Sequence, residues 1–407
     1  MRRRIFAAAV PVMLWLAAVP SGQASGQSIF GINFLGEHQF CGSGRYRALG
    51  FSSYAALDSV CAVSANLATM ADLPRMTFSM VEAVGFSNIQ SDDTTAYENR
   101  FQLPSVMIGV PLRKGLVLGV GYRTRFEGKA DFSLEQPIAG SPTAREIFEH
   151  RSSLFTVPLS IAWRATTWAR VAGMLQLERG SIKDNSRIDF TATNYQAAES
   201  RRERSFSGTS WGVSALVQVH PRLSLGAGMN NSIGYDVDET FTYTRAKLDS
   251  VSPQWRFTLP SSWEIGAALG ITDRWWLSSH FWQRGAPAPD GFPQLAGSVG
   301  DERLISFGIE RRPSAAGGFF AKAPLRLGFY EDRWHLEYPA GHPVRSRFVT
   351  FGSGFSLPGG PGAIDVSFEF GQIGSTVDNG ISERVFRIGF GVSASEEWST
   401  RKPNVGE

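Results

Sequence analysis

Six histidines are the first side chains in this sequence that could do acid–base or metal chemistry. They are His38, His150, His220, His280, His335 and His342. None has the spacing of a metal-ligand set, and no serine has the strand–turn–helix context of a G-x-S-x-G nucleophile. Gly119 and Gly121 alternate along a predicted strand and do not form a phosphate-binding loop. We therefore expect no enzymatic activity, no metal and no cofactor.

Four large apolar residues near the N-terminus are the candidates for binding an apolar ligand: Phe30, Phe34, Leu35 and Phe40. They belong to residues 25–74, which lack the alternation of a strand and contain Ala-rich pieces typical of short helices. A unit of this size is marginally stable alone, so we expect it to pack on the rest of the chain. The same side chains have a second interpretation, because aromatic residues in small domains are more often core than ligand contacts.

The two cysteines, Cys41 and Cys61, lie in the same N-terminal stretch. An exported chain reaches an oxidising compartment, where a disulfide between them is expected. Two separately buried thiols are the alternative, since free cysteine behaves as a small apolar residue.

The elements that must position these residues are β-strands, and the C-terminal stretch shows them most clearly. Apolar residues alternate there with polar or small ones, at Ile364, Val366, Phe368 and Phe370. The segments 349–357 and 386–393 repeat the pattern. A period of two is that of a strand with one apolar and one polar face. The polar face includes Asp365, Glu369 and Arg387, which would face a lumen and could simply brace it.

Such strands suit a soluble sandwich or an outer-membrane barrel, and the N-terminus favours the barrel. Three arginines precede an apolar run, and small residues follow, as in a secretory signal peptide over residues 1–24. The mature chain then comprises a plug over residues 25–74, an all-β transmembrane barrel over residues 75–398 and a tail over residues 399–407. In a barrel strand apolar and polar residues alternate, so a window average of hydropathy stays low. The mean hydropathy of −0.12 is consistent with such a barrel.

From residue 75 onward, turns and alternation divide the chain into fourteen segments, although twelve or sixteen strands stay possible. Short turns alternate with long polar loops, for example after residue 126 and around Arg201 and Arg204. Barrels of the outer membrane place short turns on the periplasmic side and long loops outside. Tryptophans near strand ends suit the two interfaces of a membrane: Trp163, Trp168, Trp255, Trp275 and Trp398.

The charge balance excludes a nucleic-acid partner. Lysine and arginine number 40 against 37 acidic residues, which leaves a net charge of +3. We expect a monomer whose partners are the lipids of the outer membrane and a hydrophobic small molecule.

Three stretches of the chain resemble the long-chain fatty-acid transporter family of outer-membrane proteins, which includes toluene and xylene channels. The first runs from Arg45-Tyr-Arg-Ala-Leu-Gly50 to Ala65-Asn-Leu-Ala68, where Leu67 replaces the proline of the family. The second is Phe257-Thr-Leu-Pro-Ser-Ser-Trp-Glu-Ile-Gly266, and the third joins Leu325-Arg-Leu-Gly-Phe329 to Thr350-Phe-Gly-Ser-Gly354. The resemblance implies a fourteen-stranded barrel closed by an N-terminal plug.

The resemblance also implies passive uptake of fatty acids or hydrocarbons, with lateral release at a kinked strand near the plug. By order that strand is residues 116–126, and Gly119 and Gly121 would permit the kink. Two alternatives stay open: a barrel that scaffolds or shuttles partner proteins without transport, and a barrel hydrolase.

Overall fold

The computed structural model describes most of the chain in nine ranges: residues 28–32, 34–91, 95–136, 144–190, 196–243, 248–288, 297–314, 319–356 and 362–396. The predicted signal peptide over residues 1–24 and the tail over residues 399–407 lie outside these ranges, as does Trp398.

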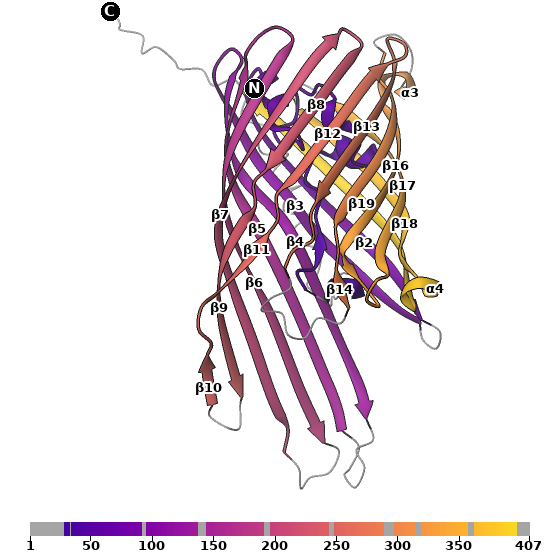
Figure 1. Ribbon diagram of the computed structural model, residues 1–407. Coiled ribbons are helices and arrows are strands. Elements are labelled where there is room, and N and C mark those ends of the chain that lie inside the picture. The colour runs from indigo at the N-terminus through magenta and orange to yellow at the C-terminus, as the bar shows by residue number, and fades with distance from the viewer. Residues whose placement is uncertain are drawn as a thin grey trace, which may run out of the picture.

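The described residues from Met76 onward form one antiparallel sheet that closes on itself (Figure 1). Its strands are β2 Met76–Ser91, β3 Thr95–Arg113, β4 Leu116–Gln136, β5 Ala144–Arg164, β6 Ala169–Phe190, β7 Ala198–His220, β8 Leu223–Asn230, β9 Ile233–Tyr243, β10 Leu248–Val251, β11 Trp255–Leu259, β12 Ser262–Gly270, β13 Trp275–Arg284, β14 Ser298–Val299, β15 Glu302–Arg311, β16 Leu325–Glu337, β17 Pro343–Ser356, β18 Gly362–Ser375 and β19 Ile381–Glu396.

Several of these strands are pieces of one longer strand. β8 and β9 both pair with β7, β10 to β12 run along β8 and β9, and β14 and β15 both pair with β16. Counted in this way, the barrel has 14 strands, and β19 pairs with β2 from Ile381↔Ser91 to Glu396↔Met76 to close it. The predicted all-β antiparallel barrel and its strand count are confirmed.

The faces of the strands follow the predicted parity. On β17, Val349 and Phe351 are about half exposed, whereas Thr350 between them is fully buried. On β18, Phe370 is half exposed, and its neighbour Glu369 is buried. An apolar outer face and a polar inner face are what a barrel in lipid requires.

The barrel wall has two heights (Figure 1). β4 to β7 contain 21, 21, 22 and 23 residues, whereas β15 to β18 contain 10, 13, 14 and 14. The predicted long polar loops after residue 126 and around Arg201 and Arg204 were therefore wrong in large part, because both stretches are strand. The physical reason is that the outer side of these stretches carries charged residues, so the apolar alternation disappears.

The N-terminal segment, residues 28–73, contains only short elements. They are η2 Ile29–Ile32, β1 Glu37–His38, α2 Gly44–Ala48, η3 Ser53–Ala55 and η4 Leu67–Asp72. Two further single-turn helices, α3 Phe319–Lys322 and α4 Thr376–Asn379, connect strands of the barrel. No helix in the described ranges has both the length and the apolar character to cross a bilayer.

Candidate functional site

The N-terminal segment lies against the inner face of the barrel (Figure 1). α2 contacts β17 to β19, η3 contacts β12 and β13, and η4 contacts β5 and β6. Ser43 caps α2 because its hydroxyl accepts a hydrogen bond from the Tyr46 amide, and Asn66 caps η4 in the same way through Ala68. These caps suffice for helices of one turn, whose stability otherwise comes from packing.

Buried ion pairs hold the segment to the wall. Glu369 has no exposed surface and lies 2.7 Å from Arg47 of α2 and 3.8 Å from Arg387 of β19. Glu37 of β1 pairs with Arg387 and Arg100. Since a buried charge without its partner is strongly unfavourable, removal of the segment would take one carboxylate from each of these wall arginines and leave Arg100 with Glu383 and Arg387 with Glu369. The inward orientation predicted for Glu369 and Arg387 agrees with these contacts.

A second set of charges lies around His38. Its Nδ1 is 3.0 Å from an oxygen of Glu302, which also pairs with Arg284 at 3.3 Å. The rings of Phe40, Phe126 and Trp282 surround the imidazole at 4.6 to 5.2 Å. This burial lowers the pKa of His38 to about 4, and the Glu302 carboxylate opposes the shift only in part.

The four predicted ligand contacts are all buried or nearly so, but in different places. Phe30 packs against Trp334, and Phe34 packs edge-on against Phe257 at 5.5 Å. Leu35 is fully buried in the same cluster as Phe34. Phe40 borders an internal cavity. The structure thus places three of them in packing positions between segment and wall.

The expected disulfide is absent, and both cysteines are free thiols. The Cys41 Sγ lies 3.2 Å from each of two carbonyl oxygens, Pro104 O and Thr124 O. The Cys61 Sγ instead lies 3.3 Å from Val63 O. Each thiol therefore contacts its own backbone carbonyl oxygens. Burial raises the pKa of Cys41 and raises that of Cys61 to about 12. Proximity along the chain misled the prediction, because the two side chains serve different contacts.

The wall splits between β3 and β4. Their pairing runs from Arg113↔Leu116 to Ser105↔Arg123 and stops there. A bulge at Arg125 then changes the register of β4 against β5. Beyond the bulge, β3 stays paired with β2 and β4 stays paired with β5, but β3 and β4 no longer pair with each other.

The N-terminal segment occupies the start of this split. β1 pairs with the edge of β4 through Glu37↔Glu127 and His38↔Phe126, and the Gln39 amide donates to Arg125 O at 2.9 Å. Gly36 has a φ of +104°, and a Cβ there would lie 2.6 Å from the Glu127 carbonyl. Only glycine permits this approach. Cys41, between Pro104 and Thr124, lies where the two strands part.

Gly119 and Gly121, predicted at a kink, lie before the split. Gly119 pairs with Gly109 of β3 and Ser160 of β5, and Gly121 pairs with Met107. The irregularity that we expected from glycines occurs at Arg125. No sequence signal marked Arg125, because a bulge needs no particular residue type.

A cavity of about 100 Å³ lies beside the split, and several of its polar groups have no partner. Arg123 donates to Ser64 O at 2.7 Å and contacts Met107 Sδ at 3.2 Å, but its Nε is unpaired and it has no carboxylate partner among the described residues. Gln39 Nε2 and Thr156 Oγ1, also more than nine-tenths buried, are unpaired as well. The cavity thus offers donors to acceptor oxygens, and Glu264 is the acidic residue on its lining.

The sequence did not single out Gln39, Arg123 and Thr156. The parity of β4 and β5 could place Arg123 and Thr156 on the inner face. Nothing in the sequence could show that the N-terminal segment brings Gln39 beside them.

Several solved barrels are similar to this chain in structure. A Pseudomonas aeruginosa FadL homologue covers 90% of this chain and 100% of its own at 10% identity, with a TM-score of 0.64. The toluene transporter TodX of P. putida covers 88% and 99% at 11% identity, with a TM-score of 0.58. The toluene transporter TbuX of Ralstonia pickettii covers 90% and 100% at 12% identity, with a TM-score of 0.55. The predicted resemblance is confirmed, and at these identities it establishes the fold of an outer-membrane barrel.

No curated protein matches the chain. The sequence profile of one family, BamG, matches residues 1–403, which is nearly the whole chain. The chain therefore belongs to the BamG family.

Proposed function

We propose that this barrel is an outer-membrane channel for passive uptake of hydrophobic small molecules, with residues 25–74 as its plug. The observation that carries the proposal is the split between β3 and β4 beside an internal cavity, with β1 on the free edge of β4. The solved barrels described as toluene transporters share the fold, which supports a channel. We propose a monomer in lipid, without catalytic activity.

In this proposal the ligand leaves sideways through the split. β1 contributes two residues of pairing, and each backbone hydrogen bond contributes only about 1 kcal/mol net. Displacement of β1 breaks these backbone bonds and the ion pairs of Glu37 and His38, but it leaves every pairing between barrel strands intact. A hydrophobic molecule that leaves here enters the membrane and avoids the aqueous phase.

The cavity favours an amphiphile with an anionic head over a bare hydrocarbon. Toluene has no oxygen that could accept from Arg123, Gln39 or Thr156, and a buried donor left unpaired costs about 1–3 kcal/mol. The carboxylate of a fatty acid would pair with Arg123 and leave the chain to apolar surroundings. Within the predicted substrate range, we therefore propose fatty acids as the better ligands.

A crosslink between β1 and β4 tests the proposal. His38 and Phe126 are directly paired, a position at which two cysteines can form a bond. In a Cys41→Ser, Cys61→Ser background, the His38→Cys/Phe126→Cys protein should lose fatty-acid uptake when oxidised and regain it after reduction. Val349→Cys/Phe370→Cys, paired on the outer face of β17 and β18, is the matched control. Uptake that is equal in oxidised and reduced forms of the test pair contradicts lateral release.

One observation favours a second candidate function, a scaffold for partner proteins. The ends of β5 to β7 far from the short turns extend past the shorter wall, at the bottom of Figure 1. They carry exposed charges such as Arg151, Lys183 and Arg201 on their outer side. A pull-down with mass spectrometry, beside extraction of bound lipids, separates the two functions. A scaffold would retain a stoichiometric protein and show unchanged uptake of fatty acids and hydrocarbons when the gene is deleted.

A further inference from the structure

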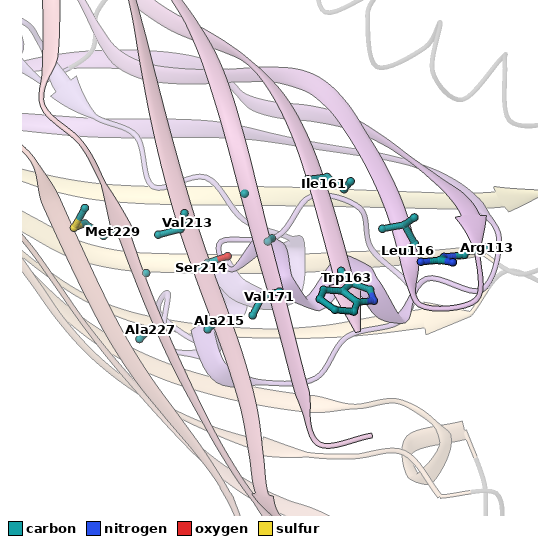
Figure 2. A pocket seen from close by; sticks show the side chains of 13 residues that line it. Arg113, Leu116, Ile161, Trp163, Val171, Val213, Ser214, Ala215, Ala227 and Met229 are labelled. Atoms are coloured by element: carbon teal, nitrogen blue, oxygen red, sulfur yellow. The ribbon is translucent and has the colours of Figure 1, made fainter. Parts of the chain in front are cut away.

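A groove on the outer surface of the barrel is separate from the proposed channel. It has a volume of about 890 Å³ and lies over β4 to β8, with Arg113 at the end of β3 at one side. Figure 2 shows Trp163, Val171 and Val213 along it and Met229 at the far end. These four side chains are 39–49% exposed, so they point away from the lumen.

The groove exists because small residues interrupt the outer apolar face. Across the strands, Ile161, Gly173, Val213 and Met229 form one paired row, and Trp163, Val171, Ala215 and Ala227 form the next. A Cβ added at Gly173 would meet no atom within 4 Å. Large side chains thus surround a floor formed by Gly173, Ala215 and Ala227.

The groove lies at the level of the leaflet on the side of the short turns. Leu116 begins β4 directly after the β3–β4 turn, and Trp163 is one residue before the end of β5. Trp168, between β5 and β6, is 54% exposed, as expected for a tryptophan at the membrane interface. From β5 to β8 there are three strand spacings, roughly 14 Å measured across the strands.

The charged residues at one end of the groove indicate which kind of molecule could bind in it. Arg113 lies at the interfacial end, and neither it nor its neighbour Lys114 has a carboxylate partner in the described part of the chain. The lining contains no acidic residue. An apolar groove that ends at an unpaired cation at the interface complements one acyl chain and the phosphate of an anionic lipid.

We infer that this groove binds one anionic phospholipid of the periplasmic leaflet, with an acyl chain over Gly173 and the phosphate at Arg113. The site goes beyond the channel function and does not depend on it. A protein partner is a different occupant, and the test includes it as an outcome.

Native mass spectrometry of the intact barrel with added phosphatidylglycerol or phosphatidylcholine tests the inference. The unmodified protein should retain one phosphatidylglycerol and bind it more tightly than phosphatidylcholine. Arg113→Gln should weaken phosphatidylglycerol binding about tenfold, the effect of one charge-assisted hydrogen bond, and remove the preference. Gly173→Trp should weaken binding of both lipids, because the indole fills the groove.

Two controls match these variants. Val349→Trp adds the same bulk to an outward position of β17, and Arg274→Gln removes an arginine from another short turn. Both should bind lipid as the unmodified protein does. If Gly173→Trp does not assemble, Ala227→Phe fills the same groove from β8. Equal lipid binding by the groove variants and the controls overturns the inference. It is also overturned if Gly173→Trp loses a co-purified protein but keeps the lipid.

Discussion

The short wall and the tall wall of the barrel differ most in the residues on their outer sides. On the short wall, Glu369 and Arg387 lie inside, buried and paired with Arg47 and Glu37 of the N-terminal segment. The outer side there carries stacked rings, such as Phe351 and Phe368 at 4.7 Å. On the tall wall, the upper halves of the strands carry exposed ion pairs on the outer side, for example Lys183–Glu203 at 2.7 Å.

The difference shows where each part of the wall meets lipid and where it meets water. β6 keeps one register against β5 throughout, so its odd-numbered residues face outward along its whole length. Leu175 and Leu177 are among these residues in the lower half, and Lys183 and Arg187 are among them in the upper half. Apolar residues give way to charged ones between Leu177 and Lys183, which places the outer membrane interface there.

The largest effect is expected where a charge is buried. Glu369→Gln leaves Arg47 and Arg387 without their shared carboxylate, and the loss of one partner of a buried pair costs roughly 3–5 kcal/mol. Denaturant unfolding in detergent micelles measures this cost. Glu331→Gln, which breaks an exposed pair with Arg347 on the same wall, should cost at most about 1 kcal/mol. Similar costs for both variants would remove the distinction between inner and outer charges.

The next effect tests the boundary on the tall wall. Leu175→Arg places a charge in the lipid-facing half of β6, where it should cost about 2–4 kcal/mol at mid-membrane depth. Asn185→Arg changes a residue of the same strand and the same outward parity but above the boundary, and should stay within about 0.5 kcal/mol. Assembly is measured by comparing the gel migration of heated and unheated samples, which differs for a folded barrel. A boundary above Asn185 would make both variants fail.

A smaller effect concerns pH and the N-terminal segment. The pKa of His38 is lowered to about 4 in the folded protein from 6.5, so folding favours the neutral imidazole. Its contribution is complete above pH 6.5 and is lost as the pH falls towards 4, by roughly 2 kcal/mol at pH 5. The protection of residues 28–73 against hydrogen exchange, measured relative to the intrinsic exchange rate at each pH, should therefore fall between pH 7.5 and 5. His38→Gln, which cannot titrate, should show a weaker pH dependence, and an equal dependence would exclude His38 as the cause.

The smallest effect is expected at an exposed pair of the tall wall. Lys183→Met removes the contact with Glu203, and exposed pairs contribute about 0–1 kcal/mol that salt screens. The difference in unfolding free energy should shrink further at 1 M salt. A loss above about 2 kcal/mol would show that the upper wall depends on its charges as the lumen does.

The fold was predictable where one face of a strand meets lipid and the other face meets the lumen. Phe368 and Phe370 alternate with Ser367 and Glu369 because lipid and lumen impose opposite requirements, and the turns between such segments yield fourteen strands. The ends of β4 to β7 far from the short turns were missed because charged residues lie on both of their faces, so the stretch resembled a loop. Arg201 is exposed on the outer side, and Arg204 is buried on the inner side. The bulge at Arg125 was missed because it depends on how β4 meets β5.

Sequence alone determined the fold class, the strand parity and the inward charges, since each follows from local alternation and residue type. Only the tertiary structure decided what those charges bind. The chain returns residues 28–73 into the barrel, and this brings Glu37 to Arg100 and Arg387, Gln39 to the cavity beside Arg123, and Cys41 to the split instead of to Cys61. The contact between Glu37 and Arg387 joins residues 350 positions apart. No local pattern encodes them, because they depend on the path of the segment through a closed barrel.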